Sequence, residues 1–218
     1  MGLQDDQPDL PAAGPADEAA GTGLQALDRL SERLLAAAPS LRVAVAETPS
    51  EHEAGYALRY RQVIADGWAR ADELPDGLER DDHDADALQI NAWDGEALVG
   101  TLRLVLPAAG RHLPVETAFG LEVEPVGEVA EAGRLVIEPA RRGDAAHGVW
   151  GALFARAWVT LRARDLAVLA GTASPRMVAR LRALGLPFEI LGPARPFWGE
   201  ERHPVRLDPA HGSPRWFQ

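Results

Sequence analysis

Cysteine and lysine are both absent from this 218-residue chain. Without cysteine, disulfide bonds, thiolate nucleophiles and cysteine-ligated zinc sites are excluded. Without lysine, all 22 basic residues are arginines, and the 33 acidic residues bring the net charge to −11. Binding a nucleic acid or an anionic membrane requires clustered cations, so this acidic balance argues against both as the main partner.

Long apolar runs are missing as well. No stretch of about 18 apolar residues occurs, so we predict no membrane span. The N-terminus is acidic and lacks the apolar core of a signal peptide, and Asp6 stands where a myristoylation site needs serine or threonine. We therefore expect a cytoplasmic protein.

Two common kinds of catalytic centre also lack their motifs. The six histidines are scattered without an HxxxH or HxH pair, so we predict no metal site. The absence of Gly-x-Ser-x-Gly argues against a serine hydrolase.

The apolar content of 46% is enough for the core of one domain. Residues 1–23 are rich in Pro, Ala, Gly and Asp without periodicity, so we expect a disordered tail followed by a single domain over 24–218. Hydrophobic periodicity predicts helices over 24–37, 51–67, from about 149 to 161, and 175–184. It predicts strands over 41–46, 88–93, 97–106, 135–137, 166–171, 188–191 and 204–207, with loops over 69–86 and 107–127.

The segment from Glu128 to Leu161 organises this pattern. A buried strand around Leu135–Ile137 is followed by the basic-glycine loop Arg141-Arg142-Gly143 and then by a helix. This arrangement presents backbone N–H groups and a helix N-terminus to an anion such as a phosphate. An ordinary strand–loop–helix connection has the same pattern. The element order indicates a mixed α/β sheet with one βαβ unit in its second half.

That order resembles the GNAT acyltransferase fold, a central mixed sheet flanked by helices. The resemblance implies a loop that holds the pyrophosphate of coenzyme A, here Arg141, Arg142, Gly143 and Gly148, and cofactor contacts from the preceding strand at Val136 and Ile137. The family's usual loop is Arg/Gln-x-x-Gly-x-Gly/Ala. In this chain four residues, 144–147, separate the two glycines.

A narrower resemblance covers residues 56–185 and is to acyl-homoserine-lactone synthases and N-acyl amino acid synthases. It rests on residue order: Arg59, Trp68, Asp81, Asp84, Arg103 after Gly100, and Glu131-x-x-Arg134. Three departures occur. The family's aromatic residue between its arginine and tryptophan is missing, Arg61 is an alternative to Arg59, and Gly133 replaces a frequent serine.

The resemblance implies acyl transfer from a thioester to an amine, which requires a base to remove a proton from the amine. Glu131 is the candidate base; the alternative is a surface carboxylate paired with Arg134. In a regular strand these two side chains point to opposite faces. We therefore expect a bulge near Gly133 if both line one cleft, and such a bulge also frees a backbone N–H to bind the thioester carbonyl.

The resemblance assigns the other residues to the substrate. Asp81 and Asp84 would bind the amine of the acceptor, although an acidic solvated loop has the same composition. Arg103 follows a central strand and needs a carboxylate partner, so a purely structural network is also open. Trp68 would wall the acceptor pocket or lie in the core. Thr172 would lie near the acyl carbonyl or cap the next helix.

Three functional hypotheses follow. The first is an N-acyltransferase that uses acyl-CoA or acyl carrier protein (acyl-ACP) as co-substrate and acts on an amino acid or S-adenosylmethionine. Arg141, Arg142, Arg156, Arg176 and Arg180 would form its docking patch for the acidic carrier protein. The second, a conventional acetyl-CoA-dependent N-acetyltransferase, predicts no deep apolar tunnel between the fourth and fifth strands. The third is a catalytically silent thioester-binding module. Acyl length, acceptor and oligomeric state are left open.

Overall fold

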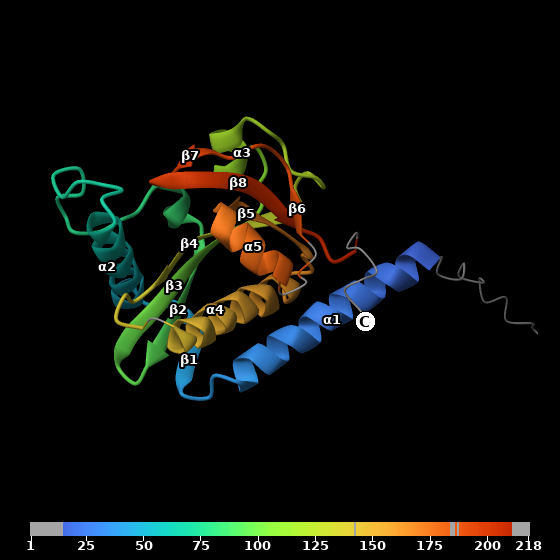
Figure 1. Cartoon of the computed structure of the whole chain (residues 1–218), viewed down its shortest axis with the longest axis horizontal. Helices are drawn as coiled ribbons and strands as arrows, with labels where there is room; N and C mark the ends of the chain where they lie inside the picture. The colour runs from blue at the N-terminus through green and yellow to red at the C-terminus, as the bar shows by residue number, and fades with distance from the viewer. Residues whose placement is uncertain (1–14, 142, 184–185, 187, 211–218) are drawn as a thin grey trace, which may run out of the picture.

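The computed structural model describes residues 15–141, 143–183, 186 and 188–210 (Figure 1). Its helices are α1 (Pro15–Ala36), α2 (Pro49–Ala65), α3 (Pro114–Phe119), α4 (Asp144–Arg162) and α5 (Pro175–Ala183), with a 3₁₀ turn η1 (Asp82–Ala85). Its strands are β1 (Leu41–Val45), β2 (Leu88–Asp94), β3 (Ala97–Val105), β4 (Val129–Ile137), β5 (Val168–Ala173), β6 (Phe188–Ile190), β7 (Arg195–Phe197) and β8 (Glu200–Leu207).

One mixed sheet runs through the molecule in the strand order β1-β2-β3-β4-β5-β8-β6, with β7 paired to β8. Its neighbours are antiparallel except for β4 and β5, which are parallel and joined through α4. A parallel pair needs a crossover connection, and a helix usually provides it. The predicted βαβ unit and the mixed α/β class are confirmed.

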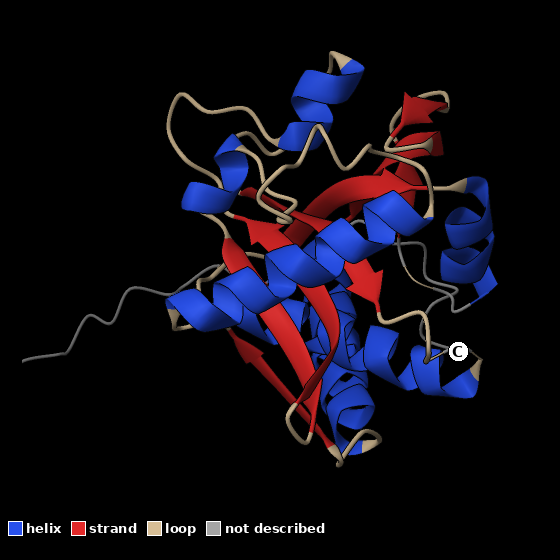
Figure 2. Cartoon of the chain, turned by 90° about the vertical axis from the view of Figure 1, so that its left-hand side faces the viewer, coloured by secondary structure: helices blue, strands red, loops and turns tan. Residues whose placement is uncertain are grey.

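Helices cover both faces of the sheet. α2 packs on β2, β3 and β4 from one side, whereas α4 packs on β1 to β4 from the other side and carries α1 on its outer surface. Figure 2 shows one helix across the near face of the strands and further helices behind them. The core beneath α4 is built from apolar side chains of the sheet and the helix, including Ile90, Leu104, Leu153, Trp158 and Leu161. This core fixes β3 and β4, which carry Arg103, Glu131 and Arg134 of the candidate site.

Several element boundaries differ from the expectation. The first helix begins at Pro15, so the predicted start near residue 24 is wrong, and the rest of the expected tail lies outside the described residues. The 107–127 segment contains the short helix α3, and β7 forms a hairpin with β8. Both were missed because a helix of six residues and a strand of three are too short to show a hydrophobic period.

Candidate active site

A notch opens where β4 and β5 separate. Their pairing covers only Val129–Glu131 against Val168–Ala170, so beyond these residues no described strand pairs with the edge of β4 that faces β5. β3 continues to pair with the opposite edge of β4 as far as Ile137. The unpaired edge is therefore held in extended form and available to an extended ligand.

β4 carries the expected bulge inside this notch. Thr101 pairs with Val136 and Arg103 with Gly133, so β4 has one more residue than β3 across this interval. The backbone of Arg134 is left-handed, with φ of 51°. The bulge brings Glu131 and Arg134 to the wall of the same cavity, as the sequence argument required.

Glu131 is buried on β4, with 4% of its surface exposed. Its carboxylate accepts a hydrogen bond from the backbone N–H of Val115, at 2.8 Å, in the first turn of α3. Burial raises the pKa of Glu131 to about 7, although this hydrogen bond and the charges of Arg103 and Arg134 act in the opposite direction. A carboxyl with such a pKa is suited to accept a proton near neutral pH.

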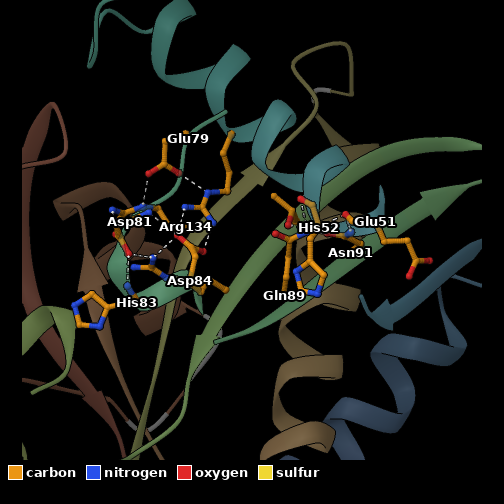
Figure 3. Close-up of polar contacts among 12 residues, drawn as sticks. Glu51, His52, Glu79, Asp81, His83, Asp84, Gln89, Asn91 and Arg134 are labelled. Atoms are coloured by element: carbon orange, nitrogen blue, oxygen red, sulfur yellow. Dashed lines mark hydrogen bonds and ion pairs between the residues drawn. The ribbon is translucent and has the colours of Figure 1, made fainter. Parts of the chain in front are cut away.

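Six charged side chains form a closed arginine–carboxylate ring beside Glu131. Each arginine contacts two carboxylates and each carboxylate contacts two arginines, in the order Arg59, Glu79, Arg134, Asp81, Arg103, Asp84 and back to Arg59. Figure 3 shows the ring around the labelled Glu79, Asp81, Asp84 and Arg134. With three charges of each sign, the ring is neutral. The network that the sequence offered as an alternative for Asp81 and Asp84 is present.

Asp84 has no oxygen left for a substrate. Its two oxygens accept a bidentate pair from Arg59 at 2.7 and 2.9 Å, and one of them also accepts from Arg103 and from the backbone of Asp81. Burial works to raise the pKa of Asp84, but the hydrogen bonds from Arg59 and the charges of Arg59 and Arg103 together outweigh it, so the pKa is lowered and the side chain stays charged. Asp84 is therefore placed to position Arg59 and Arg103.

Arg59, and not Arg61, is the arginine of this network. Arg59 lies on the buried face of α2, whereas Arg61 is exposed and pairs with Glu138. A second polar cluster fixes α2 on the sheet: the Asn91 side chain donates to the carbonyl of Glu51 at 2.8 Å, and Gln89 donates to the carbonyls of Glu51 and His52 (Figure 3). These hydrogen bonds fix the position of α2 on the sheet and therefore the position of Arg59 in the arginine–carboxylate ring.

Two tryptophans lie against the arginine–carboxylate ring. Trp68 follows α2, and its ring meets the edge of Trp198 with centroids 6.5 Å apart. The Arg134 guanidinium lies over Trp198, 3.6 Å from the ring centroid. Trp198 and Gly199 form the two-residue turn between β7 and β8, and positive φ at both residues makes it a type I′ turn.

Two adjoining cavities meet at the β4 bulge. The charged cavity, about 240 Å³, is walled by Arg59, Glu79, Glu131, Arg134 and Arg202, with Val136 and Ile137 along β4. The apolar cavity, about 340 Å³, runs under β5 and β8 between α4 and α5, and Leu102, Trp150, Phe154, Met177 and Leu207 are among its walls. Trp68, Gly133, Arg134, Thr172 and Arg202 border both cavities. A ligand with a polar head and an apolar tail fits this pair.

The expected pyrophosphate loop is only partly formed as predicted. Gly143 caps α4 with φ of 69°, and Arg141 forms an ion pair with Asp94 of the β2–β3 hairpin. Gly148 lies inside α4, so its expected place in the loop is wrong, because the helix already begins at Asp144. Arg142 lies outside the described residues.

Sequence reasoning missed three residues of the site, namely Glu79, Trp198 and Arg202. Glu79 lay within a segment of many carboxylates, and nothing in its residue type distinguishes it from its exposed neighbours. Trp198 and Arg202 belong to the β7–β8 hairpin. The Phe197-Trp198-Gly199 segment followed by alternating residues was the available signal for this hairpin.

Comparisons with known proteins place this geometry in a known fold. Residues 58–151 match the family model described as Acetyltransferase (GNAT) domain. No curated protein sequence matches the chain. No helix among the described residues is long and apolar enough to cross a membrane.

Solved structures with the same fold include three synthases. The AHL synthase LasI superposes with a TM-score of 0.62 at 16% identity, covering 78% of this chain and 90% of LasI. FeeM, an N-acyl amino acid synthase from uncultured soil microbes, gives 0.59 at 17%, covering 81% and 92%. MesI, a CoA-dependent acyl-homoserine lactone synthase, gives 0.61 at 23%, covering 81% and 91%. At these identities the likeness concerns the fold, and the chain is a GNAT-fold protein that carries a match to the GNAT acetyltransferase domain.

Proposed function

We propose that this protein is an N-acyltransferase that moves a medium or long acyl group from a thioester to the amine of a small acceptor. The observation that carries the proposal is the apolar cavity that meets, at the β4 bulge, the charged cavity lined by Glu131. An acetyl group needs no cavity of this size, whereas a long acyl chain gains free energy from burial in it. The synthases with the same fold support this assignment.

The proposed step uses the groups around the notch. The acyl chain occupies the apolar cavity, so the thioester carbonyl lies between Gly133 and Thr172. Glu131 takes a proton from the acceptor amine, directly or through water, and the amine nitrogen attacks the carbonyl carbon. Residues left outside the strand ladder by the bulge offer N–H groups to the oxyanion. The C–S bond then breaks, and the thiol leaves with a proton as the amide remains.

The donor is an acyl-CoA or an acyl carrier protein. The CoA-dependent relative MesI supports the former, and the arginines on α4 and α5, Arg156, Arg176 and Arg180, would dock the acidic carrier protein. The acceptor is an amino acid or S-adenosylmethionine, because FeeM is an N-acyl amino acid synthase and the acyl-homoserine lactone synthase BjaI, which has the same fold, was solved with S-adenosylmethionine. A conventional acetyl-CoA-dependent N-acetyltransferase is the second candidate, and the family match over residues 58–151 favours it.

Thiol release tests these assignments. Acetyl-, octanoyl- and palmitoyl-CoA and acyl carrier protein would each be offered with a pool of amino acids and S-adenosylmethionine. We expect acceptor-dependent release with the longer chains, falling about 10²–10⁴-fold in Glu131→Gln. Glu128→Gln, on the exposed turn before β4, is the matched control and should behave as wild type. Release from acetyl-CoA alone would support the second candidate, and binding of acyl-CoA without release would indicate a silent module.

A further inference from the structure

The charged cavity holds one arginine that the arginine–carboxylate ring does not use. Arg59 and Arg134, which also line this cavity, each contact two ring carboxylates. Arg202 enters from β8 and pairs with Glu200, at 2.5 Å, a residue of the more exposed end of the strand. Within the described structure, the Nε of Arg202 is buried and has no hydrogen-bond partner. Its charge is therefore the least compensated on this wall.

A cation–π contact helps to place Arg202. Its guanidinium lies over the ring of Trp68, 5.7 Å from the centroid, and the residue lines both cavities, as Thr172 does. Burial lowers the pKa of Arg202, and the nearby Glu200 only partly offsets this effect. A partly desolvated guanidinium beside an aromatic ring is a suitable receptor for a carboxylate, because arginine presents its donors in a rigid fork.

We propose that Arg202 binds the carboxylate of the acceptor and so selects amines that carry a carboxylate on the adjacent carbon. This assignment rests on the proposed function, since Glu131 in the same cavity would receive the acceptor amine. An α-amino acid and the amino acid portion of S-adenosylmethionine both present the two groups together. Polyamines, amino sugars and lysine side chains of proteins lack the carboxylate and would be rejected.

A buried Nε without a hydrogen-bond partner also occurs on Arg206 of the same strand, and this residue provides the control. Arg206 lies four residues further along β8, is 20% exposed against 21% for Arg202, pairs with one carboxylate, Glu189, and also has an unpartnered Nε. It borders neither the charged nor the apolar cavity. Arg206→Gln therefore removes an equivalent charge from the same strand without touching the proposed site.

The test compares a pool of L-α-amino acids with a pool of the corresponding amino acid amides. In acyl-transfer assays with octanoyl-CoA, we expect wild type and Arg206→Gln to prefer the acids at least about tenfold in kcat/KM. Arg202→Gln should lose this preference while its turnover of the amides stays within about threefold of wild type, because only the ion pair with the carboxylate is removed. An unchanged preference in Arg202→Gln overturns the proposal.

A binding measurement separates this proposal from the proposed function. Without donor, the acid pool at millimolar concentration should raise the Tm of wild type and Arg206→Gln but not of Arg202→Gln, and the amide pool should raise none of them. That pattern without any thiol release would support the carboxylate site and refute the acyltransferase. Equal Tm shifts by acids and amides in wild type, or a shift by acids that persists in Arg202→Gln, would overturn the role of Arg202.

Discussion

At the scale of single residues, Glu131 shows how burial prepares a base. The unfolded carboxyl titrates near 4.5, and in the fold its pKa is raised to about 7. Between these values the native state binds more protons than the unfolded state, so wild-type stability falls as the pH rises through this window. Above pH 7 the cost is complete, on the order of 3 kcal/mol.

Glu131→Gln removes this cost without losing the acceptor for the Val115 N–H. We expect the variant to be more stable than wild type at pH 8, by up to about 3 kcal/mol, and the difference to vanish as the pH falls to about 4.5. Urea unfolding at several pH values measures it. A difference that does not depend on pH would show that the Glu131 carboxyl titrates normally.

Neutralising Asp84 should have the opposite effect on stability, because the pKa of this carboxyl is lowered in the fold and it stays charged. Asp84→Asn leaves Arg59 and Arg103 without the charge they share, and breaking a buried ion pair in this way costs about 3–5 kcal/mol. Asp86→Asn is the control: its pair with Arg111 is exposed, and exposed pairs contribute at most about 1 kcal/mol. Chemical denaturation of the two variants should separate them clearly, and equal losses would contradict a structural role for the ring.

Residue types and their spacing predicted part of the candidate site. The need of a buried arginine for a carboxylate predicted that Arg103 would meet Asp81 or Asp84, and it contacts both. The spacing of Glu131 and Arg134 predicted a bulge near Gly133, although the left-handed residue is Arg134. Glu79 could not be singled out, because its role depends on the convergence of α2, β4 and its own loop.

At the scale of elements, the β7–β8 turn packs against Trp68, which lines both cavities. Gly199 has φ of 72°, and a Cβ there would overlap the ring of Trp68. Gly95, in the β2–β3 turn, also has a positive φ, but a Cβ there would meet nothing within 4 Å.

Gly95→Ala should therefore cost only backbone strain, about 1–2 kcal/mol. Gly199→Ala should cost about 1–3 kcal/mol more, since Trp68 must also move, and should change the tryptophan fluorescence and reduce acyl transfer. Thermal unfolding with fluorescence detection compares the two variants. Equal losses with unchanged fluorescence would mean that Trp68 is not held by this turn.

Elements differ in how well a sequence reveals them. The confirmed strands β2 and β3, of seven and nine residues, flank the Asp94-Gly95 turn, which is a strong local signal for a hairpin. The N-terminal half of α1 lacks the leucine stripe of its second half, so its helical start was invisible to periodicity. The loop before α4 was misjudged because its two glycines, Gly143 and Gly148, play unlike roles, one as a cap and one within the helix.

At the scale of the whole molecule, the space between α4, α5 and the sheet should set the acyl length. Met177 of α5 borders the apolar cavity and is partly buried, so Met177→Trp should fill part of it. We expect kcat/KM for palmitoyl-CoA to fall at least about tenfold relative to octanoyl-CoA. Ala179→Trp, on the exposed side of the same helix, controls for the added ring. An unchanged ratio in Met177→Trp would place the acyl chain elsewhere.

The closed ring also has a consequence for motion. Its members come from α2, from the segment before η1, from η1 itself, from β3 and from β4, so the chain between α2 and β2 is held at both Glu79 and Asp84. Moving this segment outward would leave buried charges of both signs without partners. The cost in free energy would be a large part of the total stability of a domain. The wall of the charged cavity is thus a fixed frame rather than a lid, and such a site recognises its substrate by the shape it already has.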